Sequence, residues 1–370
     1  MRKARSCRKQ ASGADPWPAP TCMSSTLPGE EAYVIDHGGA LLDAMAAHGG
    51  TAEDWLDLST GISPVSFPLP EFSADSWRRL PDPSHARHVA DLARSHYGAA
   101  VMPVITSGSQ AAIQHLPMLA RLLERGAREV AILSPTYGEY EAAFGRAGFA
   151  VRTVSSLAEA RDADAVVLAN PNNPDGRMFA PDELAVFASA RGNRLTVVDE
   201  AFADCHPEIS AADRAGAIPG LLVLRSFGKF FGLAGVRLGF AFAAEPLSRA
   251  LSEALGPWPV SGPALEIAAF AFSSDDRLAR QRAEIERCHA MTAWAIADAS
   301  STVLGQTALF FLLDAGNGAA MRDALARHRI LARAFDHSPR RLRLGLVASG
   351  EEAERLAGAL KAIRAAVVRS

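Results

Sequence analysis

From about residue 85 the chain alternates short apolar runs with stretches whose apolar residues recur at helical spacing. The first helical stretch, residues 111–126, ends on Gly126, a common C-cap residue, and the second, residues 181–192, begins with a proline suited to the first helical turn. The alternation predicts a mainly parallel sheet with helices on both faces. Strands are expected within residues 129–137, 149–155, 164–169, 194–202 and 220–229.

After about residue 260 the pattern changes to long helices, which we expect to be interrupted near residues 273–276. Two apolar strands within residues 307–315 and 341–347 and a closing helix over 350–368 follow, which predicts a second, smaller α+β domain. The predicted organisation is an N-terminal extension (1–25), a segment that crosses to the small domain and the site (26–65), a large domain (66–262) and a small domain (263–370).

Composition narrows the function classes. The 370 residues include 38 Lys and Arg against 41 Asp and Glu, so no basic field indicates nucleic acid or an acidic membrane. The four cysteines are scattered without a CxxC pair, which argues against a zinc site or a disulfide framework and fits the cytoplasm. No apolar run approaches the roughly 20 residues of a membrane helix. We expect residues 1–25 to be a disordered tail, or a start assigned too early, with Met23 the true start.

Polar residues of unusual type follow the predicted strands. Asn173, Asp199 and Ser226 each stand at or just beyond a strand end, and Lys229 follows three residues after Ser226. Ligands of parallel sheets bind at the carboxyl ends of the strands. A lysine that loses proton affinity in a desolvated or cation-flanked site forms a Schiff base with a carbonyl.

Two further features favour an anionic, ring-containing cofactor. Gly108, Ser109 and Gln110 stand at a helix start, where backbone N–H groups attract a phosphate, and Arg237 supplies a forked cation. Asp199 is costly as a buried charge unless it meets a cation such as a protonated pyridine nitrogen. Each residue alone has an ordinary structural explanation, but together they describe pyridoxal 5′-phosphate.

The motifs NPNNPDG, VVDEAF and SFGKFFGLAGVRLGF give a resemblance. From about His37 onward the chain resembles the class I/II aminotransferase superfamily of fold type I, and within it the histidinol-phosphate aminotransferase branch. The resemblance implies a homodimer in which Lys229 forms the Schiff base and Asp199 pairs with the pyridine nitrogen. It further implies that Asn173 bonds the ring oxygen, Tyr137 stacks on the ring, Gly108, Ser109, Gln110, Ser226 and Arg237 hold the phosphate, and Arg343 receives the substrate α-carboxylate.

Three positions depart from the aminotransferase pattern. Phe202 replaces the usual tyrosine after DEA, which removes one hydrogen bond to the ring oxygen. Gly228 replaces the serine often found before the lysine, and Leu80 stands where a neighbouring subunit of relatives lends a tyrosine to the phosphate. These departures put an ordinary transamination site in doubt.

The segment with HGG and DLSTGISP is similar to the threonine-phosphate decarboxylases of cobalamin biosynthesis, as are RLPDP, DEAF and GPWPVSGPAL. That resemblance implies decarboxylation of L-threonine O-3-phosphate to (R)-1-aminopropan-2-yl phosphate and CO₂. The residues it suggests for the substrate are His37, Ser59, Thr60, Gly61, Asn173, Arg333 and Arg343. Which arginine takes the phosphate and which the carboxylate stays open.

Two alternatives remain at this point. The first is an aminotransferase that acts on histidinol phosphate or a related amino acid. The second is a non-catalytic regulator built on the same fold, against which stand the complete lysine, aspartate and arginine set and the lack of a preceding DNA-binding domain.

Overall fold

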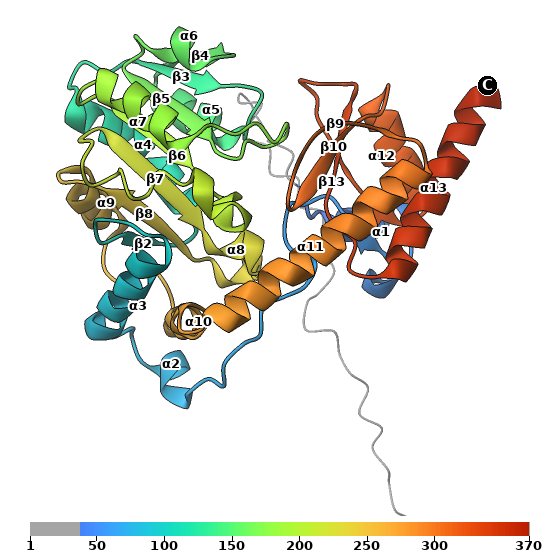
Figure 1. Ribbon diagram of the computed structural model, residues 1–370, viewed down its shortest axis with the longest axis horizontal. Coiled ribbons are helices and arrows are strands. Elements are labelled where there is room, and N and C mark those ends of the chain that lie inside the picture. Colours follow the sequence, from blue (N-terminus) through green and yellow to red (C-terminus); the bar gives the residue numbers. More distant parts are fainter. Residues whose placement is uncertain (1–37, 370) are drawn as a thin grey trace, which may run out of the picture. The chain divides into compact units, whose positions relative to one another are not determined.

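The computed structural model describes residues 38–369. The predictions on residues 1–25 and on His37 lie outside the described residues. The largest sheet has seven strands in the order β2-β8-β7-β6-β5-β3-β4 (Figure 1). Neighbours from β7 to β4 pair in parallel, and β8 runs antiparallel to both β7 and β2, so the predicted mainly parallel sheet is confirmed. The strands are β2 (Val104–Thr106), β3 (Glu129–Leu133), β4 (Ala150–Val154), β5 (Ala165–Ala169), β6 (Leu195–Asp199), β7 (Leu221–Ser226) and β8 (Gly239–Ala243).

Both faces of this sheet are covered by helices. In β5, Val166 and Leu168 belong to one buried apolar core and Ala165 and Val167 to the other. This is why the central strands are apolar throughout instead of alternating with polar residues. One face packs against α3 (Pro83–His96), α7 (Pro181–Ala190) and α10 (Gly262–Phe272), and the other against α4 (Ser109–Leu123), α5 (Glu139–Arg146) and α9 (Leu247–Leu255).

The predicted end of α4 is wrong. The helix ends at Leu123, and its C-cap Glu124 has extended backbone angles. The N–H of Ala127 then donates to the carbonyl of Glu124 at 2.9 Å, which closes a turn leading into β3. Gly126 therefore serves this turn instead of capping the helix.

The C-terminal part contains the predicted long helices and strands. The expected interruption is confirmed, because α10 ends at Phe272 and Ser274 caps the next helix by accepting from the Arg277 N–H. A four-stranded antiparallel sheet in the order β12-β13-β10-β9 follows (Figure 1). The elements of the C-terminal part after α10 are α11 (Asp275–Asp298), β9 (Thr302–Thr307), β10 (Phe310–Asp314), α12 (Gly318–Arg327), β12 (Arg333–Ala334), β13 (Arg341–Leu344) and α13 (Gly350–Arg369).

The beginning of the described chain contributes to this C-terminal part. α1 (Leu41–His48) contacts α12, and β1 (Leu56–Asp57) pairs in parallel with β11 (Ile330–Leu331). The sequence pattern did not predict this helix and strand. The division into domains at residues 25, 65 and 262 stays a prediction. Within residues 38–369, no helix has both the length and the apolar character needed to cross a membrane.

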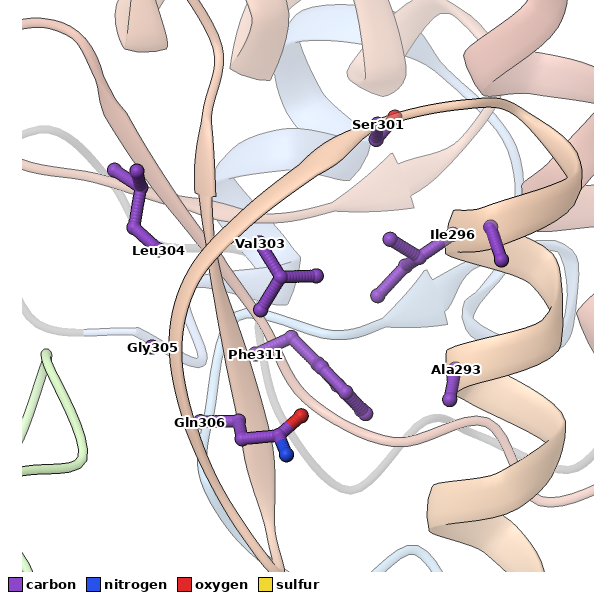
Figure 2. Close-up of a pocket in the computed structure, with 9 residues that line it drawn as sticks. Ala293, Ile296, Ser301, Val303, Leu304, Gly305, Gln306 and Phe311 are labelled. Atoms are coloured by element: carbon purple, nitrogen blue, oxygen red, sulfur yellow. The ribbon is translucent and has the colours of Figure 1, made fainter.

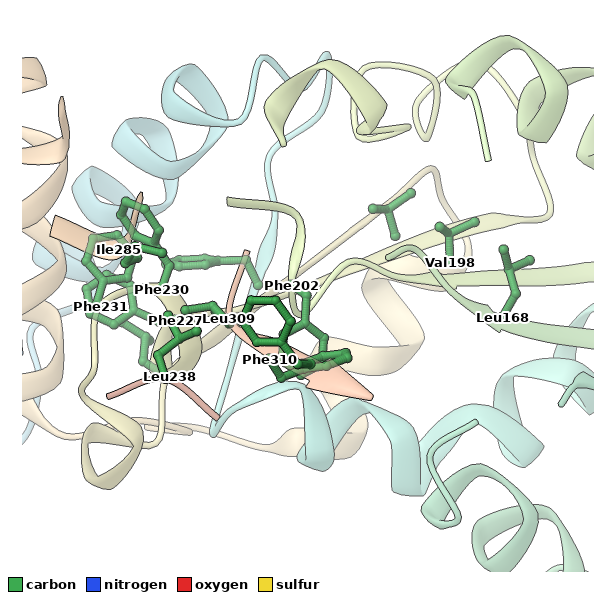
Figure 3. Close-up of a cluster of buried hydrophobic side chains, with 14 of the residues drawn as sticks. Leu168, Val198, Phe202, Phe227, Phe230, Phe231, Leu238, Ile285, Leu309 and Phe310 are labelled. Carbon is green, nitrogen blue, oxygen red and sulfur yellow. The ribbon is translucent and has the colours of Figure 1, made fainter. Parts of the chain in front are cut away.

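Aromatic side chains join the two sheets around the short helix α8 (Phe227–Phe230) (Figure 3). Phe227 stacks on Phe231 with ring centroids 3.9 Å apart. Phe202, which follows β6, meets Phe310 of β10 edge to face at 5.2 Å. Because such pairs add to the energy of burial, α8 is held in a rigid apolar setting.

Arg225, near the carboxyl ends of β6 and β7, is a buried cation. Arg225 is 2% exposed, and its Nη1 donates to Glu200 Oε2 at 2.8 Å while Nη2 lies 3.3 Å from Asp204 Oδ1. Its guanidinium also lies over the Tyr97 ring, 4.2 Å from the centroid. Glu200 and Arg225 directly neighbour Asp199 and Ser226 along the chain, so this ion cluster fixes the ends of β6 and β7.

We expect Arg225→Met to lower the free energy of unfolding by about 3–5 kcal/mol, because it leaves two buried carboxylates without a cation. Urea denaturation measures the change. As a control, Arg214→Met removes an exposed ion pair with Asp182 and should cost at most about 1 kcal/mol. Equal losses in the two variants would contradict the expectation.

Candidate active site

Asp199 is the last residue of β6 and is 3% exposed. Its Oδ2 accepts a hydrogen bond from the Tyr140 hydroxyl at 2.7 Å, and its Oδ1 accepts from the Ala201 N–H at 3.0 Å. Burial raises the pKa of Asp199 above the usual value of an aspartate. A positively charged ring nitrogen placed beside this carboxyl would supply the missing cation and favour the ionised form.

Tyr140 belongs to this arrangement, although the sequence predicted a role only for Tyr137 of the same PTYGEY stretch. It is 1% exposed, and burial followed by the charge of Asp199 raises its pKa well above that of a free tyrosine. It therefore stays a hydrogen-bond donor to Asp199. The spacing of Tyr137 and Tyr140 at i and i+3 was the available signal, but only the fold shows which ring reaches the aspartate.

Tyr137 lies beside this pair. Its ring meets that of Tyr140 edge to face, with centroids 5.6 Å apart. Its hydroxyl donates to Gln110 Oε1 at 3.2 Å, and Gln110 Nε2 donates in turn to Glu139 Oε2 at 2.8 Å. Burial raises the pKa of Tyr137 to about 12, and the charge of Glu139 adds to the shift. Tyr137 is thus neutral and held in place from its hydroxyl end.

The start of α4 is the predicted phosphate site. Gly108 has φ = 73°, which favours glycine, and a Cβ there would lie 3.0 Å from Arg237 Nη2. The guanidinium of Arg237 therefore lies against the N-cap of a 15-residue helix whose first residues are Ser109 and Gln110. Ser226 lies near by in the sheet, paired with Gly239 at the end of β7. Helix N–H groups and a guanidinium together favour a phosphate.

Lys229 stands on α8, directly after β7. Its Nζ lies 5.7 Å from the centre of the Phe202 ring. Burial, followed by the positive charge of Arg343, lowers the pKa of Lys229 to about 8. The neutral amine, which is the form that attacks a carbonyl, is therefore more accessible near neutral pH than in an ordinary lysine. A Cβ on the preceding Gly228 would lie 2.9 Å from Ala234 Cα, which explains why glycine occupies that position.

Two arginines face each other across β12 and β13. Arg343 pairs directly with Arg333 in the antiparallel ladder, and like charges at such positions repel. Arg343 is buried, donates to Asn173 Oδ1 at 2.6 Å and to the Ser59 carbonyl at 2.7 Å, and its Nε has no hydrogen-bond partner among the described residues. Burial and the charge of Arg333 lower the pKa of Arg343 to about 10. An anion bound beside this pair would offset the repulsion between the two charges.

Of the predicted substrate residues Ser59, Thr60 and Gly61, Ser59 contacts Arg343 through its backbone carbonyl, and its hydroxyl is engaged elsewhere. That hydroxyl donates to Asp57 Oδ1 at 2.6 Å and accepts from the Gly39 N–H at 2.7 Å. Thr60 is half-buried. Gly61 is buried, and a Cβ there would lie 2.8 Å from a carbon of the Phe202 ring. The three residues thus shape the site through backbone and close packing.

One well-formed cavity among the described residues is lined by none of these residues. It has a volume of about 480 Å³ and is bounded by α11, β9 and β10 (Figure 2). Its lining is mainly apolar and contains none of the predicted site residues; it comprises Ala293, Ile296, Ala297, Ser301, Val303, Leu304, Gly305, Gln306 and Phe311. The polar constellation at the strand ends, and not this cavity, is the candidate active site.

Comparisons with known proteins identify the family of this chain. The family model described as "Aminotransferase class I and II" matches residues 71–361. The chain belongs to the class I and II aminotransferase family. A threonine-phosphate decarboxylase from Sinorhizobium sp. is 43% identical over 88% of this chain and 97% of its own length, and one from Pseudomonas aeruginosa is 42% identical with the same coverage.

Among solved structures, the histidinol-phosphate aminotransferase from Sinorhizobium meliloti in complex with pyridoxal-5′-phosphate is similar. The match covers 93% of this chain and 100% of the aminotransferase chain, with a TM-score of 0.78 and 20% sequence identity. The fold class predicted from the sequence, fold type I, is thereby confirmed.

The described residues fit pyridoxal 5′-phosphate, the cofactor of this family. Asp199 would hold the ring nitrogen, Lys229 would attach the aldehyde carbon, and the start of α4 with Arg237 would hold the phosphate. The burial of the Asp199 carboxyl, which raises its pKa, and the lowered pKa of Lys229 are the observations that support the fit. The individual residue roles stay predictions.

We expect Arg343→Gln to raise the pKa of Lys229 from about 8 toward the usual lysine value, because it removes a positive charge that disfavours the protonated amine. The measurement is the pH dependence of Lys229 acylation in cofactor-free protein, followed by mass spectrometry. Arg341→Gln, two residues away on β13, is the control and should leave the midpoint unchanged. An unaltered midpoint in Arg343→Gln would contradict this electrostatic explanation.

Proposed function

We propose that this chain is a pyridoxal-phosphate-dependent lyase that converts L-threonine O-3-phosphate to (R)-1-aminopropan-2-yl phosphate and CO₂, a step of cobalamin biosynthesis. The observation that carries the proposal is the identity of 42–43% with threonine-phosphate decarboxylases over 97% of their length. The site supports it, because two opposed arginines suit a substrate with two anionic groups.

The reaction depends on orientation of the substrate. When bound, the cofactor withdraws electrons from the substrate Cα, and the bond that breaks is the one best aligned with the ring. Arg343, held by Asn173 and the Ser59 carbonyl, would grip the α-carboxylate. Arg333 would hold the phosphate, with His37 as a further predicted contact. A substrate held at both ends cannot rotate freely about Cα, so the two cations would select loss of CO₂.

The remaining residues would maintain the electronic state of the site. Asp199, kept in place by Tyr140, would keep a proton on the ring nitrogen. Lys229, with a pKa of about 8, would exchange a proton at the substrate Cα after CO₂ leaves. Phe202 lies against Phe310 and offers no hydroxyl to the ring oxygen, which leaves Asn173 as the predicted donor.

Oligomeric state and location are proposed here by analogy with the family. We propose a homodimer in the cytoplasm. Leu80 is 66% exposed, which is consistent with its place at a subunit contact. Sedimentation equilibrium would check the mass against twice 39.2 kDa.

We expect the purified protein to release CO₂ from L-threonine O-3-phosphate without any 2-oxo acid, and Lys229→Ala to abolish this release. Trapping of CO₂ and phosphorus NMR of the aminopropyl phosphate provide the measurement. Formation of a keto acid at the expense of glutamate, with no CO₂, would instead identify an aminotransferase and overturn the proposal.

We expect Arg333→Gln to lower kcat/KM for threonine phosphate by roughly 10- to 100-fold, because it removes a charge-assisted bond to the phosphate. Its effect on unphosphorylated L-threonine should be small. Arg343→Gln should impair both substrates, since both carry the carboxylate. The opposite pattern would assign the phosphate to Arg343.

A further inference from the structure

Four consecutive carbonyl groups, those of the last two residues of α8 and of the two residues that follow it, all accept hydrogen bonds from other segments of the chain. Carbonyls at a helix end have no partner within the helix and must be satisfied elsewhere. Three of them accept from residues 63–67, which lie just beyond Gly61 of the site. The bonds are Ser63 N–H to Lys229 O (2.9 Å), Phe67 N–H to Phe231 O (2.8 Å) and Ser66 Oγ to Gly232 O (3.1 Å).

The fourth carbonyl, that of Phe230, accepts from Gln281 of α11. Gln281 is 4% exposed, and its Nε2 lies 2.9 Å from Phe230 O, 2.9 Å from Val65 O and 3.3 Å from Ser63 Oγ. A single amide group therefore bonds both the lysine-bearing helix and the segment that runs beside it. No other residue type offers two amide hydrogens on a side chain of this length.

Toward its other end, helix α11 is bonded to the segment that follows the strand of Arg343. Thr292, eleven residues beyond Gln281, accepts from the Val347 N–H at 3.0 Å and donates to the Cys288 carbonyl at 2.8 Å. Val347 follows closely on β13, which carries Arg343. Figure 1 shows α11 extending from α10 and α8 to the C-terminal sheet. Helix α11 thus connects the segment that carries Lys229 to the segment that carries Arg343, the arginine proposed to bind the substrate carboxylate.

We propose that Gln281 is a positioning residue that fixes the Lys229 amine relative to Arg343 by holding the carbonyl end of α8 and residues 63–65 against α11. It touches neither substrate nor cofactor and acts through the backbone of its neighbours. The reaction that it serves is the one proposed above, and to that extent the inference rests on the proposed function.

The first experiment compares Gln281→Leu with Ile285→Val. Leucine leaves the carbonyls of Phe230 and Val65 without this donor, whereas Ile285, one turn further along the buried face of α11, makes only apolar contacts. In cofactor-free protein we expect Gln281→Leu to speed hydrogen exchange about tenfold in the peptide that covers residues 62–69, and Ile285→Val to leave it unchanged.

Steady-state kinetics provide the second readout. Because a small misplacement of a reacting group slows the chemical step, kcat should fall about tenfold in Gln281→Leu with KM within twofold of the parent value. Ile285→Val should change neither. Unchanged exchange in Gln281→Leu, or equal kinetic losses in the two variants, would overturn the proposal.

Gln281→Glu tests the same idea if the leucine variant fails to fold. A buried glutamate has a raised pKa, and only its protonated form can donate to a carbonyl. We expect its kcat, relative to the parent enzyme, to rise about tenfold between pH 8 and pH 6. A parallel pH profile would contradict a role for the donated bond. Hydrogen exchange needs no substrate, so failure of the proposed reaction would leave that test of Gln281 standing.

Discussion

The hydrogen bond from Arg343 to Asn173 joins the C-terminal sheet to the strand ends of the seven-stranded sheet, and the site exists only where these two parts meet. Close backbone contacts beside it depend on two glycines. A Cβ on Gly176 would collide with the carbonyl of Gln306, and a Cβ on Gly305 with that of Asp175. Any larger residue at either glycine would push β9 away from the NPNNPDG loop. The close approach of the two sheets therefore depends on the backbone at these two glycines. The hydrogen bond from the charged Arg343 side chain adds to it.

This junction also determines the electrostatics. The positive charges of Arg343 and Arg237 and the buried carboxyl of Asp199 all act on Lys229, and Arg343 pairs with Arg333 in the C-terminal sheet. Charges of one sign are costly to bring together, and part of the cost shows as the lowered pKa of Lys229 and of Arg343. Anionic ligands offset that cost. The same repulsion that prepares the amine for attack thus favours a phosphorylated cofactor and a doubly anionic substrate.

The fold class, most strand positions and the interruption between α10 and α11 were predictable, because burial on both faces produces continuous apolar runs and because turn residues punctuate them. The boundary at Gly126 was wrong, since a glycine is suited equally to a cap and to a turn. Tyr140, Arg225 and Gln281 escaped prediction for a different reason. Their partners, Asp199, Glu200 and Phe230, are 25 to 59 residues away along the chain, and no local pattern reports such contacts.

By itself the sequence determined the parallel sheet, the cofactor and the residues at the strand ends, since those properties follow from short-range periodicity and from motifs read in order. The tertiary structure alone decided which groups are buried together, how far the pKa of Lys229 falls and which hydroxyls are already engaged, as that of Ser59 is. Burial and Coulomb interaction depend on distance in space, and separation along the chain does not specify that distance.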